Sequence, residues 1–175
     1  MNRIIVAEMA MPDPQAFTEE VDIVPQLPKN LQGTLSSSKW KERKEVLDEL
    51  AKVVNTPRIK DAPELGDVVK GLAGRMTDAN INCVIGSAQC LEMLAKGLMS
   101  SFARYRETVV HPMLERLKER KQSVTDAIGL ALDAVFLTVR HSKPHSKYDA
   151  YAMHRCRYRT SFLTSCQHSR RRIHK

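Results

Sequence analysis

The sequence has few aromatic residues and no long apolar run, and each shortage excludes a class of protein. Only 5% of its 175 residues are aromatic, which is too few for the strands of a β-sandwich or barrel, where aromatic side chains are enriched. No apolar stretch approaches the roughly 18 residues that a membrane-spanning helix needs. Glu8 interrupts the short apolar run near the N-terminus, so it does not resemble a secretory signal. We therefore expect a helical intracellular protein that has no membrane partner.

Motifs of catalysis and cofactor binding are also missing. The chain holds no Gly-rich phosphate loop, no Ser/His/Asp order and no paired carboxylates on a cleft-forming loop. We expect no enzyme activity, no cofactor and no small-molecule substrate. Its four cysteines, without a signal peptide, do not make a disulfide framework. Two of them, Cys83 and Cys90, share one face of a predicted helix and are interpreted as buried free thiols.

The net charge of +8 is located almost entirely in the C-terminal segment. Residues 1–139 hold 18 basic and 19 acidic side chains, whereas residues 140–175 hold 10 basic side chains and one acidic one, Asp149. The body of the chain is nearly neutral and the tail carries a charge of +9. The overall charge therefore says little about the partner of the body.

Apolar residues recur at steps of three and four through the middle of the chain, which is typical of amphipathic helices. The pattern predicts five helices, over residues 41–54, 64–76, 81–98, 109–117 and 124–139. Polar turns at 38–41, 77–80 and 121–123 recur at a spacing of roughly 40 residues, which is typical of HEAT-type helix pairs. Ser123 and Asp126 at the third turn have the spacing of a capping box. An unrelated helical bundle is the alternative, but two matched intervals favour the repeat.

These patterns divide the chain into three parts. Four prolines among acidic residues indicate a disordered leader over residues 1–28. Residues 29–139 form the repeat domain, an all-α solenoid of about three HEAT-type antiparallel helix pairs. Residues 140–175 lack helical periodicity and form a basic tail that we expect to be disordered.

Segments at the three turns go beyond generic HEAT character. They are Ser36–Leu47, which contains the string SSKWKER, Asp78–Ile85 and Leu114–Ile128. In this order they resemble the first three turns of a TOG domain, the tubulin-binding module of microtubule polymerases, and look most like a fungal member. The resemblance covers roughly residues 22–139.

The resemblance implies that only the N-terminal half of one domain is present. The family's domain has six HEAT repeats, and this chain has three. Because solenoids need polar caps on their terminal repeats, we expect an exposed apolar face around Ile128, Leu132 and Phe136. Such a face would lower stability and promote self-association.

The resemblance also implies a function and a binding site. Its partners would be the tubulin heterodimer and the microtubule, and its role would be plus-end polymerisation at the cytoskeleton, the spindle pole or the kinetochore. Tubulin docks on the row of turns in the family. The residues that the resemblance places there are Trp40, Lys41, Arg43, Asn80, Ile81, Lys118 and Lys121.

Each of these residues also has a structural interpretation. Trp40 could pack against the start of its own helix, but the cations on either side of it make a core position unfavourable. Asn80 could cap a helix whose core face begins at Ile81. Lys118 and Lys121 could lie at a solvated helix end, where cations are favoured by the helix dipole.

The tail departs from the family and suggests a second function. It is interpreted as sequence from outside the TOG coding region, such as an intron or a shifted frame, or as a divergent terminus. Its His and Cys residues do not have the spacing of a standard zinc knuckle, and we expect no metal. A tail of this charge would bind polyanions in a salt-dependent way. A generic HEAT scaffold with a polyanion-binding tail is therefore the alternative function. The zinc-type residues are His154, Cys156, Cys166 and His168.

Overall fold

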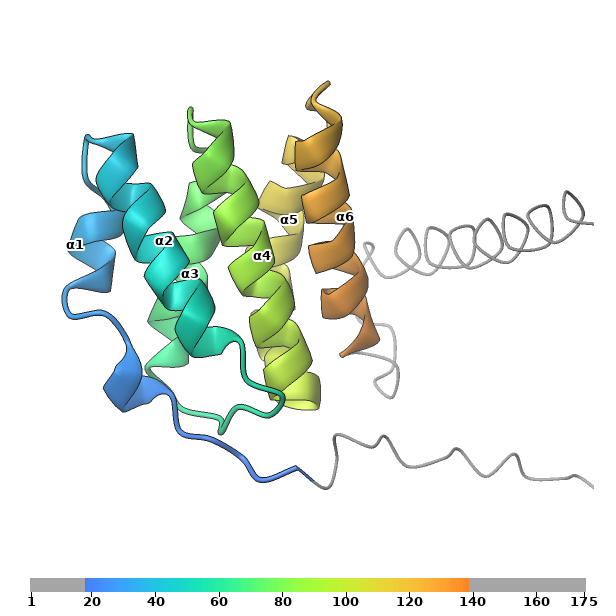
Figure 1. Cartoon of the computed structure of the whole chain (residues 1–175). Coiled ribbons are helices and arrows are strands. Elements are labelled where there is room, and N and C mark those ends of the chain that lie inside the picture. The colour runs from blue at the N-terminus through green and yellow to red at the C-terminus, as the bar shows by residue number, and fades with distance from the viewer. Residues whose placement is uncertain (1–17, 139–175) are drawn as a thin grey trace, which may run out of the picture.

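The computed structural model describes residues 18–138, which form an α-solenoid of six α-helices (Figure 1). In this part of the chain the α-helices are α1 (Leu31–Leu35), α2 (Trp40–Val54), α3 (Leu65–Arg75), α4 (Ile81–Leu98), α5 (Arg106–Arg116) and α6 (Gln122–Leu137), with short 3-10 helices η2 (Val24–Gln26) and η3 (Met99–Tyr105). The pairs α1–α2, α3–α4 and α5–α6 confirm the predicted all-α, HEAT-type class.

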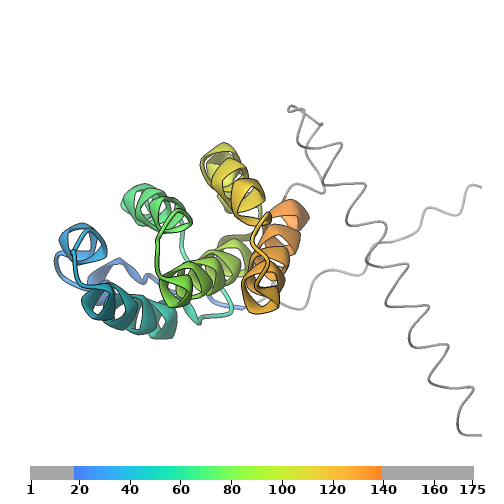
Figure 2. The ribbon, with the colours of Figure 1, turned by 90° about the horizontal axis from the view of Figure 1, so that it is seen from above.

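The helices lie in two layers that bury one continuous core between them. Figure 2 shows α1, α3 and α5 in one layer and α2, α4 and α6 in the other. Helix α4 packs between α2 and α6, and its Leu91 and Leu94 are fully buried. The turns inside the pairs lie along the upper edge in Figure 1, and the connections between pairs lie along the lower edge. The solenoid therefore has two edges, one formed by the turns inside the pairs and one by the connections between pairs.

The predicted helices agree with the structure except where a segment is short. The bounds of α4 are those expected, and the other predicted helices differ at their ends by a few residues. Helix α1 is required before the first turn by the three predicted pairs, but its bounds could not be predicted because five residues are too few to show periodicity. The η3 segment lies between two of the predicted helices, and its Phe102 is fully buried. The capping box at Ser123 was wrong, since Lys121 precedes α6 and no side chain caps that helix.

The packed domain begins earlier than the expected boundary at residue 28. Ile23 is buried in the core, at 1% exposure. Val21 forms a bridge with Ile59, in which the Val21 amide donates to Arg58 O at 3.1 Å and the Lys60 amide donates to Val21 O at 2.9 Å. Residues 20–27 therefore form a strap across the lower edge, which the proline content concealed. The expected disorder of residues 1–17 and of the tail, and the four zinc-type residues, lie outside the described residues.

The outer face of α6 differs from the one expected. Ile128 and Leu132 are buried inside the three pairs, and Phe136 is partly buried. The large apolar side chains that α6 does expose are Leu130 and Leu137, at 47% and 54%. No helix within residues 18–138 is long and apolar enough to cross a membrane.

A substitution in the strap can test whether residues 20–27 belong to the folded domain or to a leader outside it. Because Ile23 is fully buried, Ile23→Ala should lower the free energy of unfolding by about 2–5 kcal/mol. Gln26→Ala, at an exposed position of the same strap, is the matched control and should change it by less than about 0.5 kcal/mol. Urea denaturation followed by circular dichroism measures both. Equal stabilities of the two variants would show that residues 20–27 are not part of the folded domain.

Candidate functional site

The three turns inside the helix pairs form one edge of the solenoid, which we call the turn edge. It consists of residues 36–39, 76–80 and 117–121 together with the helix starts that follow them. Trp40 is the first residue of α2, and its exposure of 42% is high for a large hydrophobic side chain. Lys39 and Lys41 on either side of it are also exposed. The first turn thus presents an indole between two cations.

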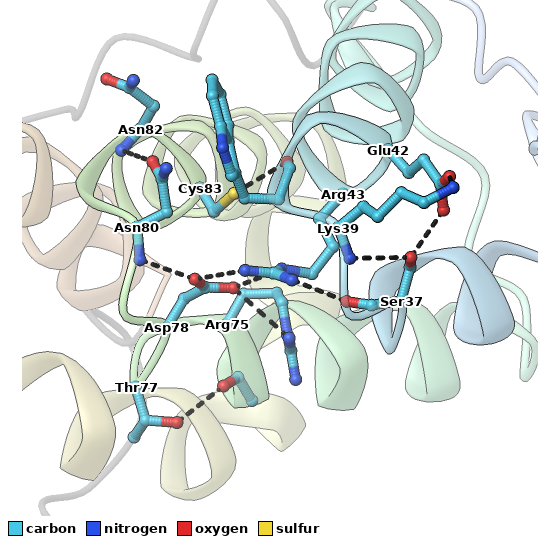
Figure 3. Close-up of polar contacts among 12 residues, drawn as sticks. Ser37, Lys39, Glu42, Arg43, Arg75, Thr77, Asp78, Asn80, Asn82 and Cys83 are labelled. Carbon is cyan, nitrogen blue, oxygen red and sulfur yellow. Dashed lines mark hydrogen bonds and ion pairs between the residues drawn. The ribbon is translucent and has the colours of Figure 1, made fainter.

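Arg43 is buried beneath this first turn instead of facing outward. Its guanidinium makes two parallel bonds to the Asp78 carboxylate, from Nε to Oδ2 at 2.8 Å and from Nη2 to Oδ1 at 2.9 Å. The remaining Nη1 donates to the backbone oxygen of Ser37 at 2.6 Å. Figure 3 shows Arg43 reaching from α2 to both turns. With 9% of the residue exposed, Arg43 is not a surface contact, and the expectation that it faces a partner directly needs correction.

Asp78 is the centre of the polar contacts in the second turn. Its Oδ1 also accepts a bond from the backbone N–H of Asn80 at 2.8 Å, and Arg75 lies 3.4 Å from its Oδ2. Burial by itself would raise the pKa of Asp78. The bonds from Arg43 and from the Asn80 N–H outweigh that effect and hold the pKa of Asp78 below its ordinary value. The carboxylate is therefore ionised at neutral pH inside the protein.

Asn80 and Ile81 connect the second turn to α4. The Asn80 side-chain oxygen accepts from the Asn82 N–H at 2.9 Å, so Asn80 is the N-cap of α4. Ile81 is partly buried and packs against the core. The structural interpretation of both residues therefore holds, while their side chains still lie on the turn edge.

The third turn carries cations with different surroundings. Lys118 is exposed and pairs with Glu115 at 2.7 Å, which lowers the pKa of the glutamate. Lys121 is exposed and immediately precedes α6. Arg116, which the sequence did not single out, donates from Nη2 to the backbone oxygen of Asp78 at 3.3 Å. The third turn is thereby tied to the second.

Two thiols join α4 to α2 behind this edge. Cys83 Sγ donates to the backbone oxygen of Trp40, and Cys90 Sγ donates to that of Leu47, each at 3.6 Å. Burial raises the pKa of Cys90 to about 12, so it stays a neutral thiol. Both cysteines are free and buried, which confirms their interpretation. Residues 18–138 contain no group of three or more His, Cys, Asp or Glu side chains that could hold a metal ion.

Several relatives of the chain have names that refer to the spindle or the centrosome. No family model matches it. It is 43% identical over 122 residues to spindle pole body component alp14 of Schizosaccharomyces pombe, and 36% identical over 126 residues to protein mini spindles of Drosophila melanogaster. These alignments cover 70% and 71% of this chain. They span only 15% and 6% of the two relatives' lengths.

Solved structures that resemble the chain come from studies of microtubule-associated proteins. One comes from a study of tubulin recruitment and assembly by microtubule polymerases with tumor overexpressed gene (TOG) domain arrays. It has a TM-score of 0.66 and 36% identity, over 70% of this chain and 26% of that chain. A structure from a study of microtubule plus-end tracking by XMAP215, CLIP-170 and EB1 has a TM-score of 0.66 and 35% identity, over 69% of this chain and 50% of that one. The chain belongs to the TOG-domain family.

Sequence reasoning missed the contacts that brace the edge of this TOG domain. It assigned Arg43 to the surface, interpreted Asp78 only as a small polar residue that opens the helix after the second turn, and gave no role to Arg116. The available signal was the spacing of Arg43 and Asp78, which are 35 residues apart and so lie in neighbouring repeats. A cation and an anion at corresponding turns of adjacent repeats are candidates for pairing. The fungal source of this TOG domain stays a prediction.

The low pKa of Asp78 predicts a pH dependence of stability. Because the folded pKa lies below the unfolded value of about 3.9, the ion pair contributes its full stability above that pH. The contribution is lost as the pH falls through the folded pKa. Asp78→Asn should lower the free energy of unfolding by about 3–5 kcal/mol at pH 7. The difference in free energy of unfolding between this variant and the unmodified protein should become smaller at acid pH. Urea titrations from pH 7 to pH 3 measure this difference. A difference that stays constant over this range would contradict the lowered pKa of Asp78.

Proposed function

We propose that the turn edge of this TOG domain binds the tubulin heterodimer and, through it, the microtubule. The observation that carries the proposal is the exposed Trp40 at the first turn of a braced edge. The names of the similar structures, which concern tubulin recruitment and microtubule plus-end tracking, support the same partner. The relatives are TOG-domain proteins and not known enzymes, and we propose a binding role without catalysis.

Trp40 has the properties of a binding anchor. Tryptophan supplies a large rigid contact area and is enriched among residues that dominate interface energies. Leaving 42% of it exposed is unfavourable in the free protein, and a partner that covers it would recover this hydrophobic energy. Its helix start is already ordered by the contacts of Arg43 and Cys83. Less conformational freedom is therefore lost when it binds.

The exposed lysines of the same edge suit an acidic partner such as tubulin. Lys41 beside the indole, and Lys118 and Lys121 at the third turn, place positive charge at both ends of the edge. Such an arrangement raises the association rate and sets the register of docking more than it adds affinity. The contact of Lys118 with Glu115 reduces its share, so Lys41 and Lys121 should contribute more.

The relatives suggest where this binding would be used. Their names refer to the spindle pole body, to spindles and to centrosomes. We propose that the protein acts at cytoskeletal and spindle microtubules and contributes there to polymerisation. A generic HEAT scaffold with a polyanion-binding tail is the second candidate, and the charge of +9 on residues 140–175 is the observation that favours it.

Removal of the indole tests the first candidate. Trp40→Ala should weaken binding of soluble tubulin by about 2 kcal/mol or more, roughly thirtyfold, because an anchor residue is lost. The matched control is Leu130→Ala, since Leu130 has a similar exposure of 47% but lies on α6 away from the turns. It should bind within about twofold of the unmodified chain. Analytical ultracentrifugation or biolayer interferometry measures both affinities. Equal affinities of the two variants would favour the scaffold function.

Salt dependence separates the body from the tail. Deleting residues 140–175 removes nine net positive charges, so affinity for microtubules or RNA should fall at low ionic strength. The effect should fade as the Debye length shortens from about 10 Å at 0.1 M salt toward 3 Å at 1 M. Trp40-dependent tubulin binding should survive the deletion, because the turn edge is intact. If the deletion abolishes tubulin binding at high salt and Trp40→Ala does not, the tail is the binding element.

A further inference from the structure

We propose that Arg43 and Asp78 are positioning residues that hold the first and second turns in one register and thereby orient Trp40 for its partner. This inference rests on the proposed function, since it concerns how the same edge is prepared for binding. It assigns to Arg43 an internal role in place of the surface contact that the family resemblance suggested.

The pair has the geometry of a rigid clamp. Two parallel bonds of 2.8 and 2.9 Å join the planar guanidinium to the planar carboxylate, and such bidentate contacts fix orientation as well as distance. The Arg43 side chain is 11% exposed and that of Asp78 is 1% exposed. Solvent therefore offers few competing bonds that would allow the two turns to separate.

Asp78 extends the clamp to all three turns. Through Arg43 it is connected to the Ser37 carbonyl of the first turn, at 2.6 Å. Its Oδ1 accepts a hydrogen bond from the backbone N–H of Asn80, just before α4. Its backbone oxygen accepts a hydrogen bond from the guanidinium of Arg116, at the end of α5. One residue thus holds the elements that carry Trp40, Asn80 and the lysines of the third turn.

The start of α2 is supported by contacts from neighbouring segments, and the clamp is one of them. Lys39, the residue before α2, makes no side-chain capping bond to the helix. The Ser37 hydroxyl accepts from the Lys39 N–H at 3.2 Å and donates to the Glu42 carboxylate at 2.6 Å. Arg43, bonded to the Ser37 carbonyl, and the Cys83 thiol, bonded to the Trp40 carbonyl, hold the same helix start from two further sides (Figure 3). Arg43 follows Trp40 by three residues, so it lies almost one helical turn below the indole. Loss of the clamp therefore makes the backbone that carries Trp40 less ordered.

Arg43→Lys tests the clamp with little change in charge. Lysine keeps the positive charge but has a single nitrogen and cannot form the two parallel bonds. The matched control is Arg58→Lys. Arg58 binds a single oxygen of Glu20, through Nε at 3.2 Å and Nη2 at 2.9 Å, so the same substitution removes a partly exposed arginine–carboxylate ion pair on the opposite edge.

The chain's single tryptophan makes Trp40 fluorescence a direct report on the site. Emission maximum and iodide quenching are measured for the unmodified chain, Arg43→Lys and Arg58→Lys at a temperature where circular dichroism shows each to be folded. Tubulin affinity is measured under the same conditions. We expect Arg43→Lys to change quenching and to weaken tubulin binding about fivefold or more. Arg58→Lys should leave both within about twofold, even if it lowers the melting temperature equally.

The outcomes separate this inference from the proposed function. If Arg43→Lys and Arg58→Lys match in quenching and in affinity, Arg43 only stabilises the fold and the inference is wrong. If Trp40→Ala still binds tubulin normally, the proposed function is wrong whatever the fluorescence shows. If Arg43→Lys does not fold, Asp78→Asn takes its place, since its amide oxygen still accepts the Asn80 N–H while the bidentate pair is lost. Unchanged quenching in that variant would overturn the inference.

Discussion

The contact between Arg43 and Asp78 is the constraint on which the turn edge depends. A buried ion pair often adds little net stability, because two charges must leave water to form it. What it adds here is geometry, since the guanidinium fork permits only one arrangement of the two turns. The Asn80 cap, the Arg116 contact and the start of α2 all take their positions relative to the Asp78 residue. The rest of the edge is arranged around that one residue, through its carboxylate and its backbone oxygen.

The helical layers could be predicted because their signal is local and repeated. In α4 the apolar positions recur over 18 residues, so both its existence and its bounds follow from periodicity. Helix α1 and the strap at Ile23 are too short to show a period. Their place in the core depends on residues distant in sequence, such as Ile59 for the strap. No window along the chain contains that information.

In the candidate site, too, some features could be predicted from neighbouring residues and others depend on residues distant in sequence. The exposure of Trp40 could be predicted from its neighbours, because Lys39 and Lys41 resist burial. Arg43 belongs to the same run of cations, and nothing local distinguishes it from them. It is buried only because Asp78 meets it from the next repeat, and a charge is buried when a partner compensates it. The position of a charged residue is therefore decided by its partner more than by its own neighbourhood.

A polar clamp also suits what a binding edge requires. A turn can be fixed by apolar packing, but its best apolar side chain would then be buried and lost to a partner. Here hydrogen bonds and one ion pair fix the turns from beneath, while Trp40 keeps 42% of its surface exposed. The core below, from Leu47 to Leu91, supplies the stability that the clamp does not. The apolar core thus supplies most of the stability, and the clamp fixes how the anchor is presented, although removing one partner of the clamp also costs stability because it leaves a buried charge unpaired.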